Sequence, residues 1–293
     1  MYVSIRDDIL LATGFESIAD GLRFYDIPGV ELAVDRDYRV RAVTPTPERP
    51  HLALSSDDDV ARLSDQTRRG GVTISAFLLP NNFNAPDIDR ELAWVVRVVE
   101  VAASLKVPVV RIDAMMHGER ELPLQEREAI FASGMKHVLE RTDGLRVDLG
   151  IENHGFQGND PHFLDGLLAA VGSSRLGLNL DTGNFYWAGH PLDRVYEILE
   201  HFAPATKHTH VKNIRYPEEM RNRPREIGYE YETYVSPITE GDIDHARVVG
   251  LLRAAGYDRD LCIEDESIGK YDEAGRRANI RAAADYLKRL ADD

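Results

Sequence analysis

Four side chains with metal-binding chemistry stand where four successive β-type segments end. Glu152 follows residues 147–151, Asp181 follows 176–180, His210 follows 206–209 and Glu264 follows 261–263. If these segments are parallel strands of an α/β barrel, their carboxyl ends share one rim and one pocket. Three carboxylates and one imidazole suit Mn²⁺ or Mg²⁺ better than a tetrahedral structural zinc. Any one of them alone could cap a helix or meet water, so the predicted metal site rests on their joint pattern.

A metal of this kind would give the two glutamates a reaction to perform. A divalent ion that holds two neighbouring oxygens of an α-hydroxycarbonyl compound acidifies the proton between them and stabilises the resulting enediolate. Glu152 and Glu264 could then flank the substrate, one removing the proton and the other returning it to the opposite face or the adjacent carbon. We predict that they are the acid/base pair. The alternative is that both serve only as ligands and another group moves the proton.

Four further side chains are expected near the mouth of the pocket. His154 lies just beyond the strand that ends at Glu152, and His117 follows the fourth strand. Lys212 and Arg215 follow His210 closely and offer charge-assisted donors to a hydroxyl, carboxylate or phosphate. We expect all four to bind substrate, although each could instead be an ordinary surface residue.

One histidine has a different expected position. His208 is separated from His210 by a single residue, so both side chains point to the same side of the strand. We expect a hydrogen-bonded core histidine one layer deeper in the barrel.

Short apolar, β-branched runs alternate with helical patterns along the chain, which is typical of strand–helix units around a parallel sheet. The expected strands are residues 2–6, 29–34, 72–78, 109–112, 146–152, 176–181, 206–211 and 261–264. The expected helices are residues 88–106, 125–141, 162–171, 192–202, 244–255 and 273–290. At 293 residues the chain matches one α/β domain, a (β/α)8 TIM barrel over residues 1–293. An open doubly wound sheet is disfavoured because no Gly-x-Gly-x-x-Gly turn is present.

Two connections are longer than a barrel requires. Residues 35–57 are rich in proline, and residues 213–241 follow the seventh strand. Connections longer than about 12 to 15 residues are usually functional or mobile. The second connection is placed to fold over the pocket, so we expect a lid there. The acidic run 57–59 is expected to begin a helix capped by Ser55 or Ser56.

Composition narrows the classes of partner. The formal net charge is −15, which disfavours binding to nucleic acid and favours a small-molecule substrate. The single cysteine, Cys262, lies in an apolar strand and is expected to be a packing residue. The N-terminal residues do not resemble a secretion signal and no run is long enough to span a membrane, so we expect a cytoplasmic protein. Barrels of this kind often form homo-oligomers, but these residues identify no interface.

Several segments resemble the sugar phosphate isomerase/epimerase family of xylose-isomerase-like TIM barrels. They are residues 151–155 (Ile-Glu-Asn-His-Gly), 179–184 (Asn-Leu-Asp-Thr-Gly-Asn), 208–213 (His-Thr-His-Val-Lys-Asn), 241–244 (Gly-Asp-Ile-Asp), and Gly-Tyr at 256–257 with Ile-Glu at 263–264. The resemblance covers the C-terminal half, with only residues 81–83 (Asn-Asn-Phe) and the strand–helix rhythm in the N-terminal half. It implies that Glu152, Asp181, His210 and Glu264 bind one divalent metal, with Mn²⁺ expected and Mg²⁺ or Co²⁺ as alternatives. Asn184 and Asn213 stand where the family often has histidine and aspartate, and we expect Asn184 to contact substrate.

The expected function is therefore a metal-dependent isomerase or epimerase of a small sugar or keto-polyol, with proton transfer through an enediolate. The second reading is a dehydratase or lyase that uses the same proton abstraction on a keto-sugar, keto-inositol or oxidised glycoside, and the fold cannot choose between them. A DNA-repair endonuclease of the same superfamily is disfavoured by Asn184 and by the negative charge. A sugar-binding barrel without catalysis is the remaining alternative.

Overall fold

The computed structural model describes residues 1–292, and its centre is an eight-stranded parallel sheet. The sheet runs in the order β12-β1-β2-β5-β6-β7-β8-β9, and a bridge between Val211 and Ile263 brings its two edges together. The strands are β1 (Tyr2–Arg6), β2 (Gly29–Ala33), β5 (Thr73–Leu79), β6 (Val109–Asp113), β7 (Asp148–Glu152), β8 (Leu176–Asp181), β9 (Thr206–His210) and β12 (Asp260–Ile263). All eight expected strands are confirmed, with ends displaced by two residues at most.

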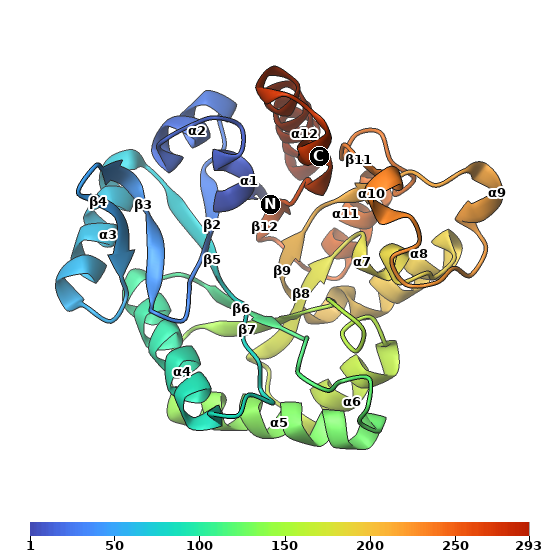
Figure 1. Ribbon diagram of the computed structural model, residues 1–293, viewed down its shortest axis with the longest axis horizontal. Coiled ribbons are helices and arrows are strands. Elements are labelled where there is room, and N and C mark those ends of the chain that lie inside the picture. The colour runs from blue at the N-terminus through green and yellow to red at the C-terminus, as the bar shows by residue number, and fades with distance from the viewer. Residues whose placement is uncertain (293) are drawn as a thin grey trace.

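Helices surround the strands (Figure 1). They are α1 (Asp7–Leu11), α2 (Ile18–Tyr25), α3 (Asp57–Gly70), α4 (Ile88–Leu105), α5 (Leu124–Arg141), α6 (Pro161–Val171), α7 (Asn184–Trp187), α8 (Leu192–Phe202), α9 (Glu218–Arg221), α10 (Tyr231–Tyr234), α11 (His245–Ala254) and α12 (Glu273–Asp292), with 3₁₀ turns η1 (Ala203–Ala205) and η2 (Glu266–Lys270). The six expected helices are confirmed. This architecture is a TIM barrel, as the sequence predicts.

Local sequence explains where α3 begins and ends. The hydroxyl of Ser56 accepts a hydrogen bond from the backbone N–H of Asp59, and three aspartates occupy the first turn. Gly71 follows the helix in the left-handed region, with φ +63°. The N-cap satisfies a free backbone donor and the aspartates interact favourably with the helix dipole, so the predicted start of α3 is confirmed.

Each of the two long connections contains a small antiparallel sheet. Within residues 35–57, β3 (Arg39–Thr46) pairs with β4 (Arg49–Ala53), a hairpin that the proline-rich sequence did not predict. Within residues 213–241, β10 (Asn213–Ile214) pairs with β11 (Val235–Ser236), and α9 and α10 lie between them. The second connection is therefore a folded segment packed beside the carboxyl ends of β8 and β9 (Figure 1).

The core contains the apolar side chains that the strands point outward and the helices point inward. Trp94, Phe131 and Phe163 are among its largest fully buried members. No helix within residues 1–292 combines the length and the apolar character needed to cross a membrane.

Candidate metal and substrate site

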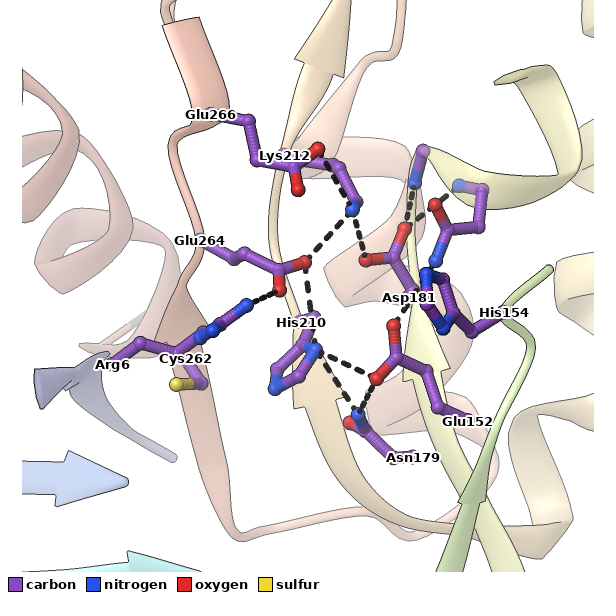
Figure 2. A network of polar contacts seen from close by, with 12 residues as sticks. Arg6, Glu152, His154, Asn179, Asp181, His210, Lys212, Cys262, Glu264 and Glu266 are labelled. Atoms are coloured by element: carbon purple, nitrogen blue, oxygen red, sulfur yellow. Dashed lines mark hydrogen bonds and ion pairs between the residues drawn. The ribbon is translucent and has the colours of Figure 1, made fainter. Parts of the chain in front are cut away.

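The structure brings together the four side chains at the strand ends. Donor atoms of Glu152, Asp181, His210 and Glu264 all lie within 4.8 Å of one another, and all four residues are buried. The Nδ1 atom of His210 is 3.3 Å from Oε2 of Glu152 and 3.4 Å from Oε2 of Glu264. Figure 2 shows these groups converging from neighbouring strands. The barrel thus supplies a compact donor set in which three of the four groups are carboxylates.

Two buried carboxylate oxygens in this set, Oδ2 of Asp181 and Oε2 of Glu264, receive no hydrogen bond. Oδ1 of Asp181 accepts from the backbone N–H groups of Gly183 (2.8 Å) and Asn184 (2.7 Å), but the buried Oδ2 receives no hydrogen bond. Oε2 of Glu264 is likewise buried without one. Buried anionic oxygens are costly unless a cation or donor satisfies them. The donor set therefore fits a divalent cation.

Three cationic side chains surround the carboxylates. The guanidinium of Arg111 lies 2.5 Å from Oε2 of Glu152, and Arg6 contacts Oε1 of Glu264. The ammonium of Lys212 is 2.9 Å from Oε2 of Glu264 and 3.2 Å from Oδ2 of Asp181, as an ion pair without hydrogen-bond geometry. Gly183 leaves room for the lysine, since a Cβ there would lie 2.6 Å from Cγ of Lys212.

These cations and His210 set the charge of the two glutamates. Burial raises the pKa of Glu152, but Arg111 and His210 more than offset this and hold the pKa well below its ordinary value. Burial also raises the pKa of Glu264, and His210, Lys212 and Arg6 together bring it well below the ordinary value. Both side chains are therefore carboxylates at neutral pH, ready to bind a cation or accept a proton.

A buried network fixes the orientation of His210. Its Nε2 lies 2.8 Å from Oε2 of Glu31 in β2, and the other oxygen of Glu31 lies 3.1 Å from Nε2 of His208. Nδ1 of His208 is 2.9 Å from Asp260, which also accepts from Ser4. When Glu31 holds the Nε2 proton of His210, the Nδ1 lone pair faces the carboxylates and can serve as a ligand. The prediction that His208 is a hydrogen-bonded core histidine is confirmed.

Amide side chains hold Glu152 from two further directions. Nδ2 of Asn184 donates to Oε1 of Glu152 at 3.1 Å, and Nδ2 of Asn179 donates to Oε2 at 3.2 Å. With Arg111, three residues thus donate to this one carboxylate. Asn184, expected to contact substrate, here positions a glutamate.

The remaining residues predicted to bind substrate differ in position. His154 lies at the edge of the site, where its Nδ1 is 3.0 Å from Oδ1 of Asp113. Burial lowers the pKa of His154, but Asp113 and Glu152 raise it above the ordinary value. His117 is exposed after β6, beside Asn82 and Asn84, and Arg215 is exposed after β10. Neither His117 nor Arg215 makes a side-chain hydrogen bond or ion pair with another described residue.

The segment of residues 213–241 reaches the site through one tyrosine. The hydroxyl of Tyr231 donates to Glu266, whose Oε2 also accepts from Lys212 at 3.1 Å. Arg225 anchors the segment by donating to the carbonyls of Tyr186 and His190, at 3.0 and 2.9 Å. The segment is thus well placed to cover the pocket, and its motion as a lid stays a prediction.

Asn213 helps to form the turn that returns the segment to the barrel. Its Nδ2 donates to the carbonyls of Ile238 and Ile243, and its Oδ1 accepts from the N–H groups of Ile214 and Ile243. An aspartate could not make the two donor contacts. The amide at this position is therefore explained by the local fold of the segment.

Sequence reasoning missed Arg6, Glu31 and Arg111, which complete the electrostatics of the site. Each stands in or at the end of a largely apolar strand, as in Val109–Asp113 with its central arginine. A charged residue in such a strand is seldom buried without a partner of opposite charge. Its presence there could have predicted an ion pair inside the barrel.

With this geometry in view, comparison with known proteins defines the family. The chain matches the family described as Xylose isomerase-like TIM barrel over residues 25–290, and it belongs to that family. No curated protein sequence matches the chain.

Three solved structures illustrate the likeness in fold. An L-ribulose 3-epimerase superposes with a TM-score of 0.70 at 16% identity, covering 99% of this chain and 94% of the other. The IolI protein with a bound zinc atom gives 0.70 at 14% identity, covering 99% and 98%. Mannonate dehydratase from Streptococcus suis serotype 2 gives 0.67 at 13% identity, covering 99% and 94%. At such identities the likeness establishes the fold alone.

Proposed function

We propose that the protein is a metal-dependent isomerase or epimerase of a small sugar or keto-polyol. The observation that carries the proposal is the convergence of four buried donor residues, Glu152, Asp181, His210 and Glu264. Two of their oxygens, Oδ2 of Asp181 and Oε2 of Glu264, lack hydrogen bonds and have Lys212 as an ion-pair partner. These four residues would hold the ion, and the carboxylate-rich set favours Mn²⁺. A divalent ion bound there would polarise substrate oxygens and so lower the pKa of a neighbouring C–H group. The epimerase among the similar structures supports this reaction class.

The hydrogen bonds around the two glutamates suggest different roles. Both oxygens of Glu152 accept hydrogen bonds, and Oε1 of Glu264 is held by Arg6. Oε2 of Glu264 is the one glutamate oxygen of the set without a hydrogen bond, so it is the atom best placed to take a proton, and it would have to leave the ion to do so. Lys212, beside that oxygen, would stabilise negative charge there before the transfer. Glu264 would release that proton to solvent, and Glu152, after taking up a proton from solvent, would donate it to the other side of the substrate.

Solvent deuterium exchange tests this proposal. The Mn²⁺-loaded protein is incubated with ketopentoses, ketohexoses and keto-polyols in D₂O, and exchange at carbon is followed by NMR. We expect deuterium to enter next to the carbonyl group, and Glu264→Gln to slow exchange by at least about 100-fold, the usual scale for general base catalysis. Asp148→Asn removes the same charge from the opposite end of β7 and is the matched control, expected to retain the exchange rate of the wild type. Wild-type rates in Glu264→Gln would show that another group moves the proton.

A dehydratase or lyase is the second candidate, because mannonate dehydratase has a similar fold. The first step would be the same proton removal by Glu264, followed by expulsion of a group from the β carbon. The same NMR experiment separates the two reactions. Exchange with retention of the carbon skeleton and all hydroxyl groups supports the isomerase or epimerase, and loss of water or of a substituent supports the lyase.

A further inference from the structure

A cavity of about 390 Å³ lies beside the candidate metal site and has no role in the proton transfer described above. It is lined by residues that follow β2, β5 and β6, including Arg36, Asn82, Asp113, Met115 and His117. All of these lie at or after the carboxyl ends of their strands, so the cavity opens on the rim that carries Glu152. Its size falls within the usual range of small-molecule sites, about 300–1,000 Å³.

The cavity and the site share a wall. Asp113 in β6 is the direct sheet partner of Glu152 in β7, and its Oδ1 lies 3.0 Å from Nδ1 of His154. Met115 packs against the next residue of that loop, since a Cβ on Gly155 would lie 2.5 Å from Cγ of Met115. A molecule held at the metal site and extending past His154 would therefore enter the cavity.

The charges lining the cavity are already paired within the protein. Arg36 donates to both oxygens of Glu91, at 3.1 and 3.0 Å. Asp113 is paired with Arg111 at 3.2 Å and with His154. A charged ligand group would have to displace one of these partners, which disfavours phosphate or carboxylate here.

What the cavity offers instead is an apolar surface with one amide donor and the exposed imidazole of His117. Met115 is 43% exposed, an unusually open position for a large hydrophobic side chain in this chain, and Pro80 and Ala85 lie in the same lining. Oδ1 of Asn82 is used by the N–H groups of Asn84 and His117, but its Nδ2 makes no hydrogen bond with any described residue. A thioether beside a free amide suits a flat, uncharged ring that carries an acceptor at its edge or at its linking oxygen.

We propose that the substrate is a sugar bearing an uncharged, ring-sized, apolar substituent, with the sugar at the metal site and the substituent against Met115. This inference rests on the proposed function for the placement of the sugar. It adds that the preferred substrate is larger than a free monosaccharide.

Direct binding tests the proposal without depending on turnover. Phenyl and methyl β-glycosides of glucose, galactose, mannose and xylose serve as non-reacting analogues, because they carry no carbonyl group. They are titrated calorimetrically into the protein, with Mn²⁺ and after chelator treatment. We expect a phenyl glycoside to bind about tenfold more tightly than its methyl partner, as burial of an aromatic ring predicts. Met115→Ala should reduce this ratio to about threefold or less while leaving methyl glycoside affinity unchanged. Phe24→Ala, another exposed apolar side chain, on α2, is the control and should leave the ratio unchanged.

Each other result contradicts the proposal. Equal affinity for phenyl and methyl glycosides in every series, no binding of either, or an unchanged ratio in Met115→Ala would overturn it. An equal loss for both ligands in Met115→Ala would show that Met115 acts on the sugar position instead. The test is also separable from the proposed function. Deuterium exchange without a phenyl preference removes only the cavity proposal, and a Met115-dependent phenyl preference without exchange removes only the isomerase proposal.

Discussion

Asp181→Asn separates metal binding from folding more cleanly than other changes at the site. Asparagine keeps an Oδ1 that can accept from the N–H groups of Gly183 and Asn184, so the turn after β8 should survive. The change replaces the carboxyl oxygen Oδ2, which receives no hydrogen bond, with an amide nitrogen that cannot bind a cation. Because burial raises the pKa of Asp181 well above its ordinary value, loss of this carboxylate should cost the metal-free protein little beyond its ion pair with Lys212.

The expected loss of metal affinity follows from the charge removed. At an effective dielectric constant of about 20, a divalent cation and a carboxylate oxygen about 2.2 Å apart attract by about 15 kcal/mol, which is an upper limit for the change. Water and the remaining ligands recover part of this. Changes to residues that only support metal ligands already cost about 10- to 100-fold, so we expect the Mn²⁺ dissociation constant to rise at least about 100-fold, or about 2.7 kcal/mol.

Isothermal titration with Mn²⁺ measures this change, and the thermal unfolding of the metal-free protein shows whether the fold is intact. Asp148→Asn is again the matched control, because it removes one negative charge at the other end of the barrel, where Asp148 pairs with Arg259. An affinity within threefold of the wild type in Asp181→Asn, or an equal loss in Asp148→Asn, would refute the assignment of Asp181 as a ligand.

Three further changes test the structure around the site. Burial lowers the pKa of His245 to about 4, so the free energy of unfolding should fall by about 3 kcal/mol as pH drops from 6.5 to 4. In His245→Gln this fall should be smaller, as measured by urea denaturation at a series of pH values. Arg225→Ala should lower the free energy of unfolding by about 2–4 kcal/mol and expose residues 213–241 to limited proteolysis, because several backbone carbonyls lose their donor. Arg223→Ala is the control and should leave digestion unchanged. Ser56→Ala should cost about 1 kcal/mol through loss of the α3 cap, and Ser64→Ala on the exposed face of α3 should cost less in the same denaturation assay.

The strands and the donor set could be predicted because both depend on short stretches of sequence, the apolar runs and the residues that end them. Apolar runs of strand length define the barrel, and a side chain at the carboxyl end of each run must lie on the common rim. The hairpin of β3 and β4 was missed because Pro45, Pro47 and Pro50 make residues 44–50 resemble a loop. A two-stranded sheet outside the barrel consists of edge strands, and these tolerate proline.

The partners of the donor set could not be predicted from spacing. Arg6 and Glu264 contact each other across 258 residues, and Glu31 and His210 across 179. Such pairs depend on which strands close the barrel and on how far each side chain reaches inward, which sequence periodicity does not contain. The same reason explains why Arg111 was not expected beside Glu152, although both strands were correctly placed.

The buried network from His210 through Glu31 and His208 to Asp260 has a further consequence. Asp260 stands at the start of β12, at the end of the barrel opposite the candidate site, and Ser4 and Tyr257 hold it there. Substitutions around Asp260 would alter the basicity of His210 while leaving the side chains at the mouth of the pocket untouched. Selection could therefore adapt this barrel to a different ion independently of its choice of substrate.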